Sequence, residues 1–328
     1  MQRSQPKKKE PHPSRLLINT KLNKIGFVSI LLCLLSHIAY ADDKVRIRLA
    51  TWNITNFTMD AGKSLFPDRS SPRLPVDLEL MEKYFLITDG DVVALQEVDS
   101  GRSARQFVGK DYHVYSEQRE FDRSRRGSPD LFTAVAVRNT EKFAASAVEE
   151  LPGLSVRISE NGLDTFTRAG IAVTISTQRS SFIFVSIHLK AGCYLSSVFT
   201  RPDCLVLRQQ FETLRSWLSS KIEAGYRNFV IAGDWNRNFV KLEKKDLLLD
   251  IVYEPALQEN IPVSLLHGEA GACSVRKNIY DYILVIGDIA KDVAKVPVTT
   301  VSPSAYELAT GAVLGDHCSI ALDLILPK

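Results

Sequence analysis

The chain is poor in the residues and patterns that define several common classes of protein. Its 328 residues include only five cysteines, six histidines and three methionines. The sequence has no CxxC pair and no closely spaced group of histidines, which argues against a structural zinc site. It also has no repeat, low-complexity tract or interdomain linker. The composition, 45% hydrophobic and 24% charged, is that of a globular protein with a sizeable core.

The first 41 residues have the pattern of a signal for export. Seven lysines and arginines precede an apolar run at residues 25–35, and Ala39 and Ala41 then give the small-x-small pattern of a signal-peptidase site. The apolar run is shorter than the roughly 20 residues that span a bilayer. We therefore expect a cleaved signal peptide at residues 1–41 and a secreted or periplasmic domain at residues 42–328. The long polar segment ahead of the apolar run leaves an uncleaved anchor as the alternative.

Loss of this leader would change the charge balance. It would remove seven of the 41 basic residues and one of the 38 acidic residues, which leaves a formal net charge of about −3 in place of +3. Any binding to a polyanion must then come from local patches or from a bound metal. In an oxidising compartment, Cys193 and Cys204 could close a short disulfide loop, while Cys273 and Cys318 also remain.

The spacing of apolar residues predicts many strands and few helices. Helical spacing occurs at residues 75–87 and 203–221, and long polar loops are expected at 54–75, 119–130 and 191–202. Many strands with a few widely spaced helices favour a layered α/β sandwich. The expected strands are 45–53, 91–97, 131–137, 166–176, 182–188, 229–234, 279–285 and 318–326.

The stretch from Phe229 to Asn236 joins an apolar strand to two oxygen-bearing side chains. Gly233 ends the strand, and Asp234 and Asn236 lie two positions apart. Residues at positions i and i+2 of an extended chain point to the same side, so both side chains can reach one ligand. A carboxylate beside an amide suits a hard cation that carries a phosphate. An Asx-rich turn at a strand end is the simpler alternative.

Other predicted strands also carry polar residues at their ends. Each one alone is a weak signal, because His188 could be a core histidine and Glu97 could mark a strand that enters solvent. Asp281 is harder to explain, since an acid within an apolar strand is costly unless it is paired. The joint occurrence of these residues is the strong signal. They are Asn53, Glu97, His188, Asp234, Asn236, Asp281, Asp316 and His317.

These residues and their neighbours resemble the motifs of the endonuclease/exonuclease/phosphatase superfamily, in its deoxyribonuclease I-like branch. The superfamily also contains abasic-site endonucleases, neutral sphingomyelinases and inositol-polyphosphate phosphatases. The resemblance implies a four-layer α/β sandwich, with two packed, mostly antiparallel sheets flanked by helices and the active site at one end. It spans residues 45–325. The matching segments are 51–53, 95–97, 167–168, 187–189, 233–236, 280–281 and 315–317.

The resemblance implies a metal-dependent phosphodiesterase. Glu97 and Asn53 would hold a divalent cation, with Asp316 as a further ligand or as a residue that orients one. Mg²⁺ is the expected cofactor, with Mn²⁺ or Ca²⁺ as alternatives, because oxygen ligands suit hard cations. Arg168 matches a phosphate-binding arginine, and its guanidinium can bind a phosphate through two parallel hydrogen bonds.

The remaining matches imply an in-line attack of water on the phosphodiester. Asp234 would align or deprotonate the water, and Asn236 would hold a phosphate oxygen. His317, oriented by Asp281, would contact the scissile phosphate or transfer a proton. His188 would assist as a general acid or as a hydrogen-bond donor to the phosphate.

Three positions depart from the family pattern. Tyr282 follows Asp281 where nucleases frequently carry a basic residue, and Trp235 replaces a common phenylalanine. A carboxylate that would orient His188 is not evident, and Asp130 is the candidate.

The export signal and one arginine-rich loop favour DNA or RNA as the substrate. Arginines in residues 119–126 could bind a phosphate backbone remote from the scissile bond. In the alternative interpretation the loop is a solvated surface, and its arginines pair with acids nearby. The arginines are Arg119, Arg123, Arg125 and Arg126, and the acids are Glu117, Glu120 and Asp122.

A sphingomyelinase-like or other phosphoester hydrolase is the second hypothesis. No long exposed aromatic hairpin suited to a membrane surface is evident. Apolar residues in the first long loop nevertheless leave a lipid substrate as an alternative, and they are Phe57, Met59, Leu65 and Phe66. An inositol-phosphate phosphatase would need a denser basic pocket. A protein that only binds its ligand is disfavoured, because every catalytic position is chemically intact. No stable protein partner is expected, and no membrane association once the leader is cleaved.

Overall fold

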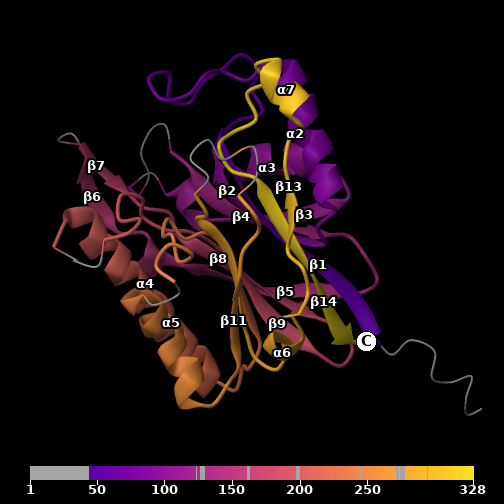
Figure 1. Cartoon of the computed structure of the whole chain (residues 1–328), viewed down its shortest axis with the longest axis vertical. Coiled ribbons are helices and arrows are strands. Elements are labelled where there is room, and N and C mark those ends of the chain that lie inside the picture. The colour runs from indigo at the N-terminus through magenta and orange to yellow at the C-terminus, as the bar shows by residue number, and fades with distance from the viewer. Residues whose placement is uncertain are drawn as a thin grey trace, which may run out of the picture. The chain divides into compact units, whose positions relative to one another are not determined.

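Two six-stranded sheets contain most of the strands in the computed structural model (Figure 1). The strands of the first sheet are β1 (Lys44–Phe57), β2 (Val92–Val98), β3 (Tyr112–Ser116), β4 (Phe132–Arg138), β13 (Thr299–Val301) and β14 (Ser319–Pro327). Those of the second are β5 (Ala144–Leu151), β8 (Gly170–Ser176), β9 (Ser181–His188), β10 (Phe229–Asp234), β11 (Val263–Leu266) and β12 (Asp281–Ile286). A separate hairpin is formed by β6 (Arg157–Glu160) and β7 (Leu163–Phe166).

The structure describes residues 44–122, 124–125, 130–160, 163–196, 200–243, 246–270, 273, 278–293 and 295–328. Residues 44–328 belong to one compact unit. The expected signal peptide at residues 1–41 and the loop residues Arg123 and Arg126 lie outside the described residues. Among the helices of the described part of the chain, none has the length and apolar character to cross a membrane.

The strand order confirms the predicted pair of mostly antiparallel sheets. The first sheet has the order β13-β14-β1-β2-β4-β3, and the second has the order β11-β12-β10-β9-β8-β5. Each sheet contains one parallel pair, β1 with β2 and β9 with β10, and the other neighbours are antiparallel. The first and last strands of the chain, β1 and β14, therefore lie next to each other in one sheet.

Alternation along the strands creates a core between the sheets and a core on each outer face. On β1, Ile47 and Leu49 contribute to the core between the sheets, while Trp52 and Ile54 point to the outer face. That outer face is covered by α2 (Pro75–Thr88) and α3 (Gly101–Val108). The outer face of the second sheet is covered by α4 (Pro202–Glu223) and α5 (Leu247–Gln258), which lie side by side (Figure 1). The result is the predicted four-layer sandwich.

Local sequence explains where the larger helices begin. Pro202 occupies the first turn of α4, where a missing N–H costs nothing. The Asp246 side chain accepts a hydrogen bond from Leu248 N and caps α5, and Ser100 caps α3 in the same way through Ser103 N. The shorter helical segments are η1 (Gln118–Phe121), η2 (Pro152–Leu154), α6 (Ile289–Val293) and α7 (Ala305–Ala309).

Most of the expected strands are present, but two boundaries differ in ways that matter for function. The first strand continues to Phe57, so the loop expected at 54–75 begins only after it. The strand expected at 166–176 is divided, because β7 ends at Phe166 and β8 begins at Gly170. Residues 167–169, which include Arg168, therefore form a short connection outside both strands.

Candidate active site

The register of the second sheet places three of the predicted residues in one row. Asp234 at the end of β10 is the register partner of His188 on β9 and of Asp281 on β12. Gly233 makes this close approach possible, because a Cβ atom there would lie only 2.0 Å from the carbonyl oxygen of Ile187. Its φ of 152° is also a conformation that other residues rarely adopt.

The first sheet supplies Asn53 and Glu97 to the same centre. The Asn53 amide Nδ2 donates to Oε1 of Glu97 at 3.0 Å and to Oδ2 of Asp234 at 3.1 Å. Its own Oδ1 accepts from the backbone N of Thr55 at 3.0 Å, and Oε2 of Glu97 accepts from the backbone N of Asn56 at 2.8 Å. One buried amide thus joins the two sheets at the point where the candidate residues meet.

Asp234 is the residue on which the others converge. It is 2% exposed, and its Oδ1 accepts a hydrogen bond from the backbone N of Asn236 at 2.8 Å. Its Oδ2 lies 3.6 Å from Nε2 of His188 and 3.8 Å from Nε2 of His317. Burial, together with the nearby carboxylate of Asp281, outweighs the attraction of His317 and raises the pKa of Asp234 to about 7.

The structure pairs His317 with Asp281, as predicted. Nδ1 of His317 lies 2.7 Å from Oδ2 of Asp281, and its backbone carbonyl accepts a hydrogen bond from Nε1 of Trp52. Burial lowers the pKa of His317, but the carboxylates of Asp281 and Asp234 outweigh it and raise that pKa well above its ordinary value. The ring is therefore positively charged at neutral pH.

His188 has the opposite electrostatic environment. Burial, and then the positive charges of Arg168 and His317, hold the pKa of His188 well below its ordinary value, so this imidazole is neutral. Its Nε2 lies 3.8 Å from Oε1 of Glu97, while its Nδ1 has no hydrogen-bond partner among the described residues. Asp130 does not orient this ring, so that prediction is wrong.

The other two residues of the candidate site differ in exposure. Asn236, at φ 50°, is 6% exposed, and its Nδ2 donates to the backbone carbonyl of Leu189 at 2.9 Å. Asp316 has a side chain that is 65% exposed, and its Oδ1 accepts from Oγ1 of Thr55 at 2.7 Å. The structure therefore brings Asp316 to the edge of the site rather than to its centre.

A cleft with a volume of about 470 Å³ opens beside these residues. Such a volume is typical of a site for a small molecule or for one part of a larger substrate. Tyr194 and Tyr280 line the cleft with their ring centroids 4.9 Å apart, and the sequence analysis selected neither of them. The candidate residues in its lining are Asn236, Asp281, Asp316 and His317.

The oxygen ligands that the site offers, and its carboxylate charges, fit a hydrated magnesium ion. In the described part of the chain, no three His, Cys, Asp or Glu side chains converge to form a closed metal-binding group. Mg²⁺ is commonly held by one or two carboxylates while it keeps several waters. Glu97 and Asp281 are close enough to Asp234 to raise its pKa, and a divalent cation bound there would offset this repulsion between carboxylates.

Comparison with known proteins gives structural matches only. No protein-family model matches the sequence, and no curated protein matches it significantly. The human Nocturnin catalytic domain with bound sulfate anion matches with 15% identity and a TM-score of 0.51, over 87% of this chain and 97% of that one. An endonuclease/exonuclease/phosphatase from Bacteroides vulgatus matches with 14% identity and a TM-score of 0.51, over 87% of this chain and 100% of that one.

The protein has the endonuclease/exonuclease/phosphatase fold. The resemblance inferred from the strand-end motifs is thus confirmed at the level of the fold. A third match is D. rerio TDP2 complexed with a single-strand DNA product, with 14% identity and a TM-score of 0.50, over 86% of this chain and 99% of that one.

Sequence reasoning missed a buried arginine that holds the backbone beside Asn53 and Glu97. Arg73 lies near the end of the long loop between β1 and α2 and is 7% exposed. Its guanidinium donates to the carbonyls of Ile54 and Thr55 at 2.9 and 2.7 Å, and to those of Asn56 and Val313. Thr55 and Asn56 have φ values of 46° and 47°, so the arginine stabilises a backbone conformation that these residues rarely adopt. That conformation directs Asn56 N toward Glu97.

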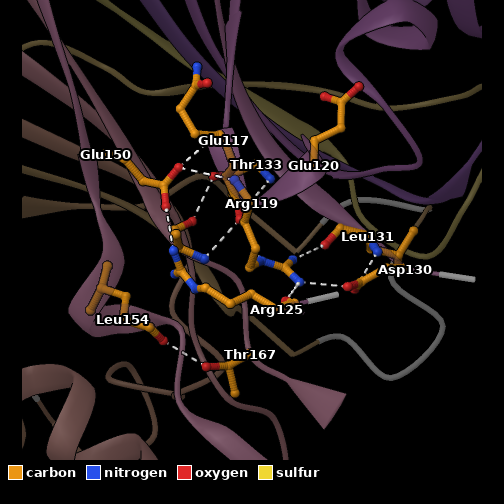
Figure 2. Close-up of polar contacts among 12 residues, drawn as sticks. Glu117, Arg119, Glu120, Arg125, Asp130, Leu131, Thr133, Glu150, Leu154 and Thr167 are labelled. Carbon is orange, nitrogen blue, oxygen red and sulfur yellow. Dashed lines mark hydrogen bonds and ion pairs between the residues drawn. The ribbon is translucent and has the colours of Figure 1, made fainter. Parts of the chain in front are cut away.

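The arginine-rich loop is tied to the protein rather than open to a ligand in the part that the structure describes (Figure 2). Arg119 is fully buried, and its guanidinium contacts Glu117 at 3.0 Å and Asp130 at 2.5 Å. Arg125 lies 3.6 Å from Glu150. The expectation that Arg119 contacts a phosphate backbone is wrong, because a side chain with no exposed surface is unable to reach one.

Two disulfides lie beside the cleft. Cys193 and Cys204 are bonded as predicted, and this bond ties the segment after His188 to the first turn of α4. Cys273 and Cys318 form a second bond that the sequence analysis did not assign. Cys318 lines the cleft directly after His317, so the second bond anchors the segment that carries His317.

Proposed function

We propose that the protein is an exported, metal-dependent phosphodiesterase whose substrate is DNA or RNA. The observation that carries the proposal is the convergence on Asp234 of Asn53, His188 and His317 at distances of 3.1, 3.6 and 3.8 Å. A carboxylate with a neutral imidazole and a charged imidazole beside it supplies the acceptor and the donors that hydrolysis of a phosphodiester requires.

The residues divide the chemistry between them. Asp234 accepts a proton from the attacking water, and its pKa of about 7 suits a general base at neutral pH. His317 is protonated and stabilises the negative charge that develops on the phosphate, while Asp281 keeps its ring in place. His188, which is neutral, donates a hydrogen bond to a phosphate oxygen.

Glu97 and Asn53 are the residues that would hold the cation, with Asp316 at the edge of the site. When bound, Mg²⁺ would neutralise charge on the phosphate. Arg168 contributes a second positive group, whose charge reaches His188 strongly enough to lower the pKa of that ring. This proposal retains the roles that the motifs imply, except that Asp130 has none.

Two features favour a nucleic acid over a lipid. The paired rings of Tyr194 and Tyr280 in the cleft offer an aromatic surface on which a base can stack. Phe57 is one of the apolar residues on which the hypothesis of a lipid substrate rested. It is fully buried, so it is not available to insert into a lipid surface. The structure of D. rerio TDP2 contains a single-strand DNA product, which supports the same substrate class by analogy.

The decisive test measures hydrolysis of three substrates by the purified protein with Mg²⁺. Duplex DNA, RNA and sphingomyelin vesicles are assayed in parallel, with an EDTA-treated sample and an Asp234→Asn variant as controls. We expect cleavage of DNA or RNA that requires the metal and the carboxylate. Cleavage of sphingomyelin alone would contradict the nuclease assignment, and no cleavage of any substrate would contradict the phosphodiesterase assignment.

Export is tested separately, by sequencing the N-terminus of protein recovered outside the cytoplasm. A mature N-terminus at Asp42 is the expected result. Recovery of the intact leader in the membrane fraction would favour the uncleaved anchor instead.

A further inference from the structure

Gln210 is a polar residue on the buried face of α4. The apolar residues of that face include Leu207, Phe211 and Leu214, and Gln210 lies three positions after the first and four before the last. Residues at this spacing share one face of a helix. The Gln210 side chain is fully buried, and a buried amide is costly unless its donors and acceptor are satisfied. The groups that its amide binds therefore explain why a glutamine lies on this face.

The partners of Gln210 lie beside two candidate phosphate-binding residues. Its Oε1 accepts from the backbone N of Lys190 at 2.8 Å, two residues after His188. Its Nε2 donates to Oγ1 of Thr167 at 3.2 Å, and Thr167 directly precedes Arg168. One side chain therefore joins the segment that carries His188 to the segment that carries Arg168.

Buried groups fix the backbone before Arg168. Oγ1 of Thr167 donates to the carbonyl of Leu154 at 2.6 Å and accepts from the backbone N of Val156 at 2.7 Å. Nε2 of Gln210 donates to the same Leu154 carbonyl at 2.8 Å. Figure 2 shows the contact between Leu154 and Thr167 below the buried network of Glu117.

The backbone after Arg168 is fixed as well. The N–H of Ala169 donates to Oε2 of Glu117 at 3.0 Å, and its carbonyl accepts from Oγ1 of Thr133 at 2.8 Å. Arg168 itself has a buried Nε that finds no hydrogen-bond partner among the described residues. A buried guanidinium nitrogen without a partner, between two fixed neighbours, is typical of a group arranged for a ligand rather than for the stability of the fold.

We propose that Gln210 is a positioning residue, which sets the distance between Arg168 and His188 so that both groups bind the same phosphate. This proposal rests on the phosphodiesterase function proposed above. It extends that function to α4, whose residues lie outside the cleft. Gln210 acts through Thr167 and Lys190, and it makes no contact with the substrate.

The test is a double-mutant cycle between Gln210→Met and Arg168→Ala. Methionine keeps the length of the side chain and its helix propensity but removes its hydrogen bonds. The kcat and KM for bis(p-nitrophenyl) phosphate are measured with Mg²⁺. Because a small misplacement of a binding group can reduce turnover strongly, we expect Gln210→Met to lower kcat/KM by about 10- to 100-fold. In the Arg168→Ala background, Gln210→Met should lower kcat/KM by less than about threefold.

Leu214→Ala is the matched control, because it weakens the same helix without touching either segment. It should lower the melting temperature while leaving kcat/KM within about twofold of the wild type. Equal losses from Gln210→Met in both backgrounds would overturn the positioning role. So would a comparable loss of kcat/KM in Leu214→Ala, because the effect would then come from general destabilisation.

A binding measurement separates this proposal from the proposed function. The affinity for inorganic phosphate is measured by calorimetry over the same four variants of the cycle. If the wild type hydrolyses no phosphodiester, the proposed function fails, and the phosphate-binding cycle still tests the position of Arg168. Independent effects of the two substitutions on phosphate affinity would overturn the inference. A loss of phosphate affinity that Gln210→Met causes only while Arg168 is intact would support it.

Discussion

Nδ1 of His317 lies 2.7 Å from Oδ2 of Asp281, and this contact turns the opposite nitrogen of the ring toward Asp234, 3.8 Å away. The carboxylate stabilises the charged form of the imidazole, so its removal should lower the pKa of His317. In Asp281→Asn the ring should therefore lose its proton at a lower pH than in the wild type. We expect kcat to fall and the alkaline limb of its pH profile to move toward lower pH. Titration of the His317 ring by NMR checks the cause, and an unchanged pKa would contradict it.

Removal of either central carboxylate should abolish hydrolysis. Glu97→Gln removes the main charge available to a cation, and Asp234→Asn removes the acceptor for the proton of water. Each loss should raise the barrier by several kcal/mol, which corresponds to a loss of roughly 1,000-fold or more in kcat. Circular dichroism should show folded protein in both cases. Turnover near the wild-type rate in either variant would contradict the proposed chemistry.

Both disulfides should be present in the exported protein. Peptide mapping without reduction should recover Cys193 linked to Cys204 and Cys273 linked to Cys318. The bonds close loops with sequence separations of 11 and 45 residues, so their removal should cost about 3 and about 4 kcal/mol of stability by the chain-entropy estimate. Cys273→Ser should also lower activity more than Cys193→Ser, because Cys318 adjoins His317. Free thiols at these positions would refute the bonds.

The arginines of the 119–126 loop should divide into two groups. Arg119→Ala leaves Glu117 and Asp130 without their cation, and breaking such a buried pair should destabilise the fold by about 3–5 kcal/mol in denaturant titrations. Arg123→Ala and Arg126→Ala instead test the proposed contact with nucleic acid. If these two residues contact a polynucleotide, each loss should flatten the log–log salt dependence of binding by up to about one unit. An unchanged salt response would leave the loop as a solvated surface.

The sequence was informative wherever a polar side chain interrupts or ends an apolar run. Asp281 was predictable because an acid within an apolar strand is costly unless it is paired. Asp234 and Glu97 were each weak signals, and only their occurrence together at strand ends selected them. The strands that carry these residues are short apolar runs, so they were predictable as well. By contrast, β5 is largely exposed, and α3 has only eight residues, which are too few to establish a helical period.

Other features depend on contacts that no local pattern records. Arg73 binds carbonyls nearly 20 residues away, and only the folded chain brings them together. Gln210 lies in a helix that was predicted correctly, but its burial follows from the partners at Lys190 and Thr167. The bond between Cys273 and Cys318 closes a loop with a sequence separation of 45 residues, and no local pattern shows that these two cysteines meet. The sequence allowed Arg119 either to bind a phosphate backbone or to pair with nearby acids. The contacts of Arg119 with Glu117 and Asp130 show that it pairs with acids.

The adjacency of β1 and β14 determines when a growing chain can acquire activity. Asn53 and Glu97 emerge early in synthesis, and His188, Asp234 and Asp281 follow from the middle of the chain. His317 comes into position only when β14, the last strand, pairs with the first. Under the proposed function, a nascent or truncated chain that lacks β14 would hold Asp234, Asn53 and Glu97 in place without Asp316 and the charged imidazole of His317. Such a chain would be harmless to the nucleic acids of the cell that makes it until β14 has been synthesised.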